Sequence, residues 1–159
     1  MSASITEPAQ FVDYDRRFLQ ASSRWLRDPE IKRLTLTPDF TDAQQERWFE
    51  SLPGRLDYRV WGVCVAGEPI GAAGLKNIDI DRSEGEYWGY IGEKAFWGRG
   101  IGVQLVQFVC EQAHLLGLRR INLRVAAENE RAIGLYRKTG FELVSEVEGL
   151  ITMQKALEE

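Results

Sequence analysis

Residues 97–102, with the sequence WGRGIG, place three glycines within five positions, where a strand-like segment gives way to a long amphipathic helix. Glycine has no Cβ, so the backbone amides there can face a bulky ligand at close range. The first turn of a helix leaves about four N–H groups without intrahelical partners and carries roughly half a positive charge. This stretch therefore predicts a strand–loop–helix unit with an anion site, most often one for phosphate.

The size and charge of the chain limit its class. A chain of 159 residues is long enough to bury a sizeable core, and we expect one domain over residues 1–159. The formal net charge of −4 argues against bulk nucleic-acid binding, which needs a basic face. The chain has no apolar run of the roughly 20 residues that a membrane helix needs, and no signal-peptide pattern at its start. We expect a cytoplasmic monomer or homodimer, with neither nucleic acid nor membrane as a partner.

The hydrophobic pattern predicts an α+β domain, with a mixed, mostly antiparallel sheet of six to seven strands flanked by about four helices. Thr41 followed by Gln44 resembles a capping box, and Asn129 is a typical N-cap. We expect an irregular connection over residues 30–39 and a loose end or edge strand over residues 1–8. The predicted helices span residues 13–28, 41–52, 100–116 and 129–139, and the predicted strands span residues 58–65, 70–75, 84–91, 121–125, 141–144 and 150–153.

A second stretch, residues 129–141 with the sequence NERAIGLYRKTGF, narrows the ligand of the glycine loop. The two stretches together resemble the GCN5-related N-acetyltransferase superfamily, and the predicted order of elements matches its fold along nearly the whole chain. In that family the loop binds the pyrophosphate of acetyl-CoA, and the preceding strand splays from its neighbour and pairs with the pantetheine arm. The resemblance implies cofactor contacts at Ile91, Gly92, Gly98, Arg99, Gly100, Ile101, Gly102 and Asn129.

Trp97 departs from the family pattern, in which Gln or Arg usually opens the loop. With an aromatic residue at this position, the loop resembles that of the branch of ribosomal-protein N-terminal acetyltransferases and amino-sugar acetyltransferases. The segments 25–31 and 48–50 also resemble that branch. These features favour the branch without choosing a substrate.

The chemistry that the resemblance implies is direct attack of a neutral amine on the thioester of acetyl-CoA, with no metal. Tyr136 is the candidate general acid for the departing thiolate, since a phenol is neutral at pH 7 and can donate a proton. Glu84 and Glu86 share one face of a strand and are candidates for a general base or for holding a water that acts as one. Asp79 and Asp81 come next. The alternative readings are a core aromatic for Tyr136 and solvated charges for the carboxylates.

Other reactive side chains are expected to be bystanders. His114 lies roughly 220° around the long helix from Ile101, away from an apolar arc that includes Leu115. Cys64 and Cys110 lie in apolar segments and are interpreted as buried free thiols, which favours direct transfer over an acyl-cysteine route. The chain shows no cluster of residues with metal-ligand spacing.

The identity of the acceptor stays open at the level of sequence. We place an amino sugar or a similar small metabolite ahead of a protein N-terminus. Trp25, Trp48 and Phe49 either line the acceptor site or pack in the core. A non-catalytic acyl-CoA-binding domain and a nucleotide-binding regulatory domain are the alternatives to an enzyme.

Overall fold

A computed structural model describes residues 8–157 of the chain. Within this range, five α-helices and one short 3₁₀ helix accompany a seven-stranded sheet, so the predicted α+β fold is confirmed. The expectation for the first residues of the chain lies, apart from Pro8, outside the described residues. Residues 10–13 form the edge strand β1, and the first helix begins three residues later than predicted, behind the capping side chain of Asp15.

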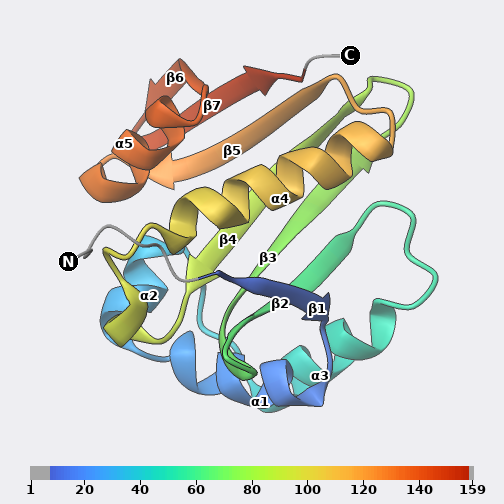
Figure 1. Cartoon of the computed structure of the whole chain (residues 1–159), viewed down its shortest axis with the longest axis vertical. Coiled ribbons are helices and arrows are strands. Elements are labelled where there is room, and N and C mark those ends of the chain that lie inside the picture. Colours follow the sequence, from blue (N-terminus) through green and yellow to red (C-terminus); the bar gives the residue numbers. More distant parts are fainter. Residues whose placement is uncertain (1–7, 158–159) are drawn as a thin grey trace.

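Along the chain, strand β1 is followed by three helices and then by three strands, and after the short 3₁₀ helix a helix, a strand, a helix and two strands complete the order (Figure 1). The helices are α1 (Arg16–Trp25), α2 (Pro29–Leu34), α3 (Asp42–Ser51), the 3₁₀ helix η1 (Lys94–Phe96), α4 (Ile101–Leu115) and α5 (Glu130–Lys138). The strands are β1 (Gln10–Asp13), β2 (Arg59–Val65), β3 (Glu68–Asp79), β4 (Glu84–Ile91), β5 (Arg120–Ala126), β6 (Glu142–Val147) and β7 (Leu150–Ala156).

The strand order in the sheet is β1-β2-β3-β4-β5-β7-β6. Every neighbouring pair is antiparallel except β4 and β5, which are parallel and are joined through α4. Parallel neighbours need such a crossover connection. The glycine stretch therefore lies at the turn between β4 and α4, as the sequence predicts.

Helix α2 corrects the expectation of an irregular connection over residues 30–39. The side chain of Asp28 accepts hydrogen bonds from the backbone N–H groups of Glu30 and Ile31, and Pro29 occupies the first helical position. An Asp-Pro pair can end one helix, but the same pair also supplies an N-cap and a preorganised first residue for the next helix. The sequence-based prediction uses this pair only as the end of the first helix.

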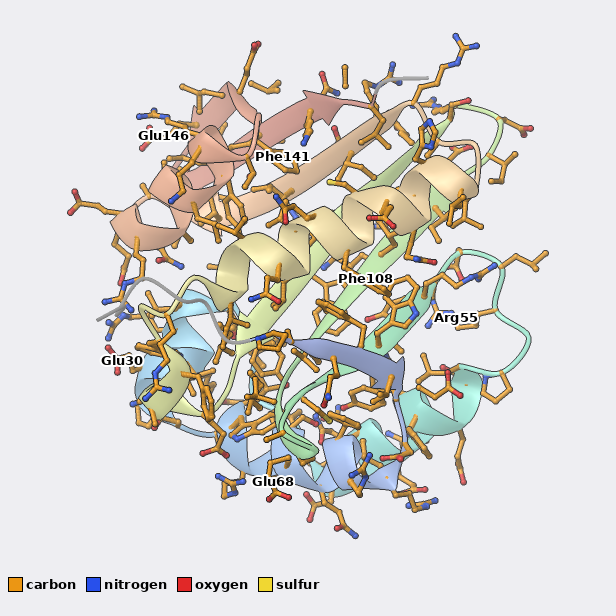
Figure 2. The ribbon with its side chains drawn as sticks, in the orientation of Figure 1. Glu30, Arg55, Glu68, Phe108, Phe141 and Glu146 are labelled. Carbon is orange, nitrogen blue, oxygen red and sulfur yellow. The ribbon has the colours of Figure 1, made fainter. Side chains whose placement is uncertain are left out.

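The two faces of the sheet carry different helices. Trp61 of β2 packs against Phe108 of α4, with ring centroids 5.1 Å apart, and Phe108 also stacks on Phe11 of β1 (Figure 2). The next residue, Gly62, faces the ring of Phe18 on α1. Because successive strand residues point to opposite faces, α1 and α4 lie on opposite sides of the sheet.

Helix α4 covers the main core, although its buried stripe differs from the predicted arc. The buried side chains include Leu105, Val109 and Ala113, which places the centre of the stripe near Val109. Leu115 lies about 120° away from that centre at 100° per residue, and its side chain is 74% exposed. The expectation that Leu115 belongs to the buried arc is therefore wrong, while His114 is exposed as expected.

The contact between Gly62 and Phe18 generates a stability prediction. A Cβ at Gly62 would lie 2.3 Å from the Phe18 ring, so Gly62→Ala must displace α1 from the sheet. We expect the free energy of unfolding to fall by about 1–3 kcal/mol, the usual cost of overpacking. Urea denaturation measures the change, with Glu68→Ala at the exposed start of β3 as the control (Figure 2). Equal stability of the two variants would contradict this packing.

Candidate active site

The site begins where β4 and β5 diverge. The two strands pair at only three positions, from Glu84 opposite Arg120 to Glu86 opposite Asn122. Beyond this point β4 continues along β3 as far as Ile91, and β5 continues along β7 as far as Ala126. Within residues 8–157, the β5-facing edge of residues 87–91 therefore has no strand partner. An extended molecule that enters the opening can pair with this edge.

A continuous cavity of about 1430 Å³ occupies this opening. It extends from the glycine loop and α5 to the helices α1–α3. Cavities for a single small ligand usually measure about 300–1,000 Å³. The space is therefore large enough for two substrates side by side.

The glycine loop forms one end of the cavity. Gly98 and Gly100 adopt the left-handed conformation, with φ of 76° and 81°, and Gly100 is the N-cap of α4. The first turn of α4 contains no acidic residue. Gly98, Gly100 and Gly102 all line the cavity, and nothing lies within 4 Å of a Cβ built on Gly98. These features fit a phosphate group at the helix N-terminus.

The structure divides the predicted cofactor residues into two groups. Ile91 and Asn129 line the cavity together with the three glycines of the loop. The side chain of Ile101 is fully buried in the core, so only its backbone N–H faces the helix N-terminus. Gly92 lies outside the cavity, and a Cβ there would come within 2.1 Å of the Trp25 indole. The guanidinium of Arg99 lies 5.1 Å from the centre of the Phe96 ring.

Trp97 ties the loop to the end of β4. Its Nε1 donates a 2.8 Å hydrogen bond to the carbonyl oxygen of Ile91. Lys94 Nζ and the guanidinium of Arg131 lie 5.7 and 5.6 Å from the centre of its ring. The aromatic residue that departs from the family pattern thus connects the loop to β4 and lies between Arg131 and Lys94, whose ammonium is ion-paired with Asp28 and Glu30.

Tyr136 lies on α5, which the side chain of Asn129 caps by accepting a hydrogen bond from the N–H of Ala132. Its ring makes edge contacts with Tyr87 and Phe141, each with centroids 5.9 Å apart. The residue is only 9% exposed but lines the cavity. Burial raises the pKa of Tyr136 to about 12. Its phenol therefore keeps its proton at neutral pH and can donate it.

Glu86 lies on the opposite face of β4 from Tyr87 and also lines the cavity. Its Oε1 accepts a 3.0 Å hydrogen bond from Asn77 Nδ2, and its Oε2 accepts one of 3.1 Å from Arg124 Nε. Lys76 Nζ lies 3.7 Å from the same Oε2. The side chain is 15% exposed, so the carboxylate is held in one position with limited access to solvent.

The other candidate bases lie outside the cavity. Glu84 forms a 2.9 Å ion pair with Arg120 at the closed end of the β4–β5 pair. Asp79 lies at the end of β3, 3.8 Å from Arg82, and Asp81 follows it in the turn. Glu84 and Glu86 lie on the same face of β4, as their spacing of two residues predicts. Only Glu86 lines the cavity, because β4 and β5 diverge after this residue.

Several aromatic side chains line the end of the cavity that faces α1–α3. Trp48 is among them, as one alternative predicted. Trp25 instead is buried and donates its Nε1 hydrogen to Glu93 at 2.7 Å, and Phe49 lines a separate cavity of about 570 Å³. Sequence reasoning missed Trp88 and Tyr90, although both share the strand parity of Glu86. The rings of Tyr14, Trp48, Tyr58, Trp88 and Tyr90 line this end together with Phe40.

The remaining reactive groups lie away from this chemistry. Cys64 and Cys110 are free and buried, as predicted, and burial raises the pKa of both thiols. Among the described residues, no group of His, Cys, Asp and Glu side chains could hold a metal ion. Across residues 8–157, the helices are too short or too polar to cross a bilayer.

Comparison with known proteins gives a consistent set of matches. The model of the acetyltransferase (GNAT) family matches residues 17–141. An uncharacterized N-acetyltransferase of Methanocaldococcus jannaschii is 32% identical over 117 residues, which cover 70% of this chain and 51% of the relative. An L-methionine sulfoximine/L-methionine sulfone acetyltransferase of Pseudomonas aeruginosa is 30% identical over 105 residues, covering 64% and 60%. The chain thus spans between half and two thirds of these relatives.

Solved structures agree in fold. The spermidine N-acetyltransferase from Vibrio cholerae, in complex with CoA and spermine, superimposes with a TM-score of 0.84 at 20% identity, covering 94% of this chain and 95% of that one. A domain from Methanocaldococcus jannaschii gives a TM-score of 0.83 at 18% identity, covering 95% and 99%. The likeness shows that the α+β sheet has the acetyltransferase fold.

The buried phenols that line the cavity predict a loss of stability in alkali. Burial raises the pKa of Tyr14 and Tyr136 from 10.0 to about 12. Below pH 10 both phenols are protonated in the folded and the unfolded chain. Between about pH 10 and pH 12 the unfolded chain binds fewer protons, so the free energy of unfolding falls as pH rises. Urea midpoints from about pH 8 to pH 11 measure this loss, and Tyr136→Phe should make it shallower. A midpoint that does not change with pH would contradict the prediction.

Proposed function

Because the chain belongs to the acetyltransferase (GNAT) family, we propose that it transfers the acetyl group of acetyl-CoA directly to the primary amine of a small molecule. The observation that carries this proposal is the opening between β4 and β5. It ends at the glycine-lined N-terminus of α4, and along it residues 87–91 of β4 present an edge that pairs with no other strand of the described chain. This combination suits a long molecule with phosphate at one end and a reactive thioester at the other.

We assign the cofactor contacts to the backbone of the loop and of β4. The N–H groups at residues 98–102 would hold the pyrophosphate, with the cation of Arg131 close to the loop. The unpaired edge of residues 87–91 would pair with the pantetheine arm, which carries amide groups. Since the Ile91 carbonyl already accepts a hydrogen bond from Trp97, the pairing is expected mainly at residues 87–90. When bound, acetyl-CoA supplies an activated acetyl group.

The chain supplies a base and an acid on two sides of β4. Glu86, on one face, would take the proton of the attacking amine directly or through a water molecule. Tyr136 packs against Tyr87 on the other face and would protonate the departing thiolate. The cavity would also hold the amine next to the acetyl group. This lowers the activation barrier of the transfer, because the two reactants lose their translational and rotational freedom when they bind and not in the chemical step.

The relatives support a small amine as the acceptor. One relative is named for methionine sulfoximine and methionine sulfone, and one structural neighbour was solved with spermine. An amino sugar, the acceptor that we placed ahead of a protein N-terminus, belongs to the same broad class. A protein N-terminus is the second candidate, because the same features resemble the ribosomal-protein branch. A panel of amines and N-terminal peptides separates the two.

The conservative variant Tyr136→Phe tests whether the cavity is catalytic. We expect kcat to fall by about 100-fold, as for loss of a general acid, while the affinity for CoA stays unchanged because the ring remains. Release of free thiol from acetyl-CoA measures turnover, and calorimetry measures CoA binding. If the protein binds CoA but turns over no amine, with or without this substitution, the chain is a non-catalytic acyl-CoA-binding domain instead.

Glu86→Gln and Glu84→Gln form a matched pair, because both lie on one face of β4 and both contact an arginine. We expect Glu86→Gln to lower kcat by roughly 100-fold, with rescue at higher pH where the free amine is more abundant. Glu84→Gln should keep kcat within about a factor of two, because Glu84 lies outside the cavity. Equal losses in the two variants would show that neither carboxylate acts as the base.

A further inference from the structure

We propose, on the basis of the function above, that the acceptor is a monoamine with a bulky apolar or aromatic body. This body would bind in an aromatic chamber at the α1–α3 end of the cavity. The aromatic chamber is the space lined by the rings of Tyr14, Trp48, Tyr58, Trp88 and Tyr90. The inference thus narrows the proposed acceptor from small primary amines in general to one class of them.

The rings form one continuous wall, although they come from separate parts of the chain. Trp48 of α3 makes edge contacts with Tyr14 and Tyr58, with centroids 5.5 and 5.9 Å apart. Tyr58 lies 6.3 Å from Trp88 of β4, and Trp88 lies 6.4 Å from Tyr90 on the same face of that strand. Such a wall offers a large apolar area with few rotatable bonds to a ligand.

The tyrosine hydroxyl groups of the chamber are largely buried. Burial raises the pKa of Tyr14 to about 12 and the pKa of Tyr58 and Tyr90 above their ordinary value, and desolvation is the largest cause for each. The Tyr14 hydroxyl lies 3.0 Å from Ser22 Oγ, so its hydrogen bonding is met inside the protein. An apolar body that displaces water from these rings gains free energy in proportion to the area that it covers.

The charges near the chamber argue against a polyamine. Around the chamber, the described helices and strands contribute two acidic side chains to the cavity lining. These are Glu30 of α2 and Glu86 of β4. Glu30, labelled in Figure 2, lies 2.9 Å from Lys94 Nζ, and Glu86 lies 3.1 Å from Arg124 Nε. Each carboxylate is thus already paired with a cation. A second ammonium group in the acceptor would lose its hydration without gaining a carboxylate of its own.

The wall also directs the amine. Trp88 and Glu86 project from the same face of β4, two residues apart, which corresponds to about 6.6 Å along a strand. A body that lies on the Trp88 ring can therefore place an amine on a short side chain next to the Glu86 carboxylate. Trp88 would then bind the body and Glu86 would remove the proton, from neighbouring positions on one face of β4.

Substrate competition tests the proposal on the wild-type protein. Thiol release from acetyl-CoA is measured with 2-phenylethylamine, spermidine, glucosamine and an N-terminal peptide as acceptors. We expect kcat/KM to be at least tenfold higher for 2-phenylethylamine than for each of the others. A preference for spermidine, glucosamine or the peptide would overturn the aromatic chamber as an apolar subsite and leave the transferase function standing. No turnover with any amine, despite CoA binding, would overturn both.

A variant then locates the body in the chamber. Trp88→Leu should lower the ratio of kcat/KM for 2-phenylethylamine to kcat/KM for ethylamine, which has no such body, by about tenfold. Trp61→Leu is the matched control, because Trp61 packs on Phe108 at the other face of the sheet and should leave this ratio unchanged. An equal effect of Trp88→Leu on both amines, or the same change of ratio in Trp61→Leu, would contradict the placement.

Discussion

The divergence of two parallel strands is the constraint on which the site depends. Hydrogen bonds join β4 and β5 over three positions only, and the strands then separate. Unpaired backbone N–H and C=O groups need partners when they leave water, so the open edge of β4 is suited to an extended ligand. The same separation produces the cavity, brings the loop at the start of α4 to one end of it, and leaves the other end to α1–α3. If β4 and β5 stayed paired along their whole length, the open edge of β4 and the cavity would both be lost.

In the proposed reaction, the two faces of β4 would divide the chemistry between acid and base. Tyr136 approaches from the face covered by α4, where burial keeps its phenol protonated. Glu86 approaches from the face covered by α1–α3, where Arg124 and Asn77 hold its carboxylate. In the proposed reaction, acid and base would thus serve one transfer without forming a hydrogen bond with each other. The proposed acceptor end would add selectivity, because its aromatic wall and paired charges would favour one kind of amine over others.

Local patterns predicted most of the fold. Hydrophobic periodicity identified α1, α3, α4, α5 and the strands β2 to β7, and the caps at Thr41 and Asn129 are present. Strand β1 lies outside the predicted strands. The prediction missed α2, because Asp28-Pro29 can both end and start a helix, and it misplaced Leu115, because the phase of a buried stripe depends on how the helix lies on the sheet. Such errors arise where one local signal has two structural outcomes.

The sequence by itself determined the strand–glycine loop–helix unit and the cap of α5, on which the predicted class of cofactor site rests, because these depend on residues that are close along the chain. Only the tertiary structure decided that Glu86 rather than Glu84 lines the cavity, that Gly92 packs against Trp25, and that five distant aromatic rings form one wall. Those choices depend on where β4 leaves β5 and on how α1–α3 pack on the sheet. They are contacts between distant segments, and local periodicity carries no information about their distances.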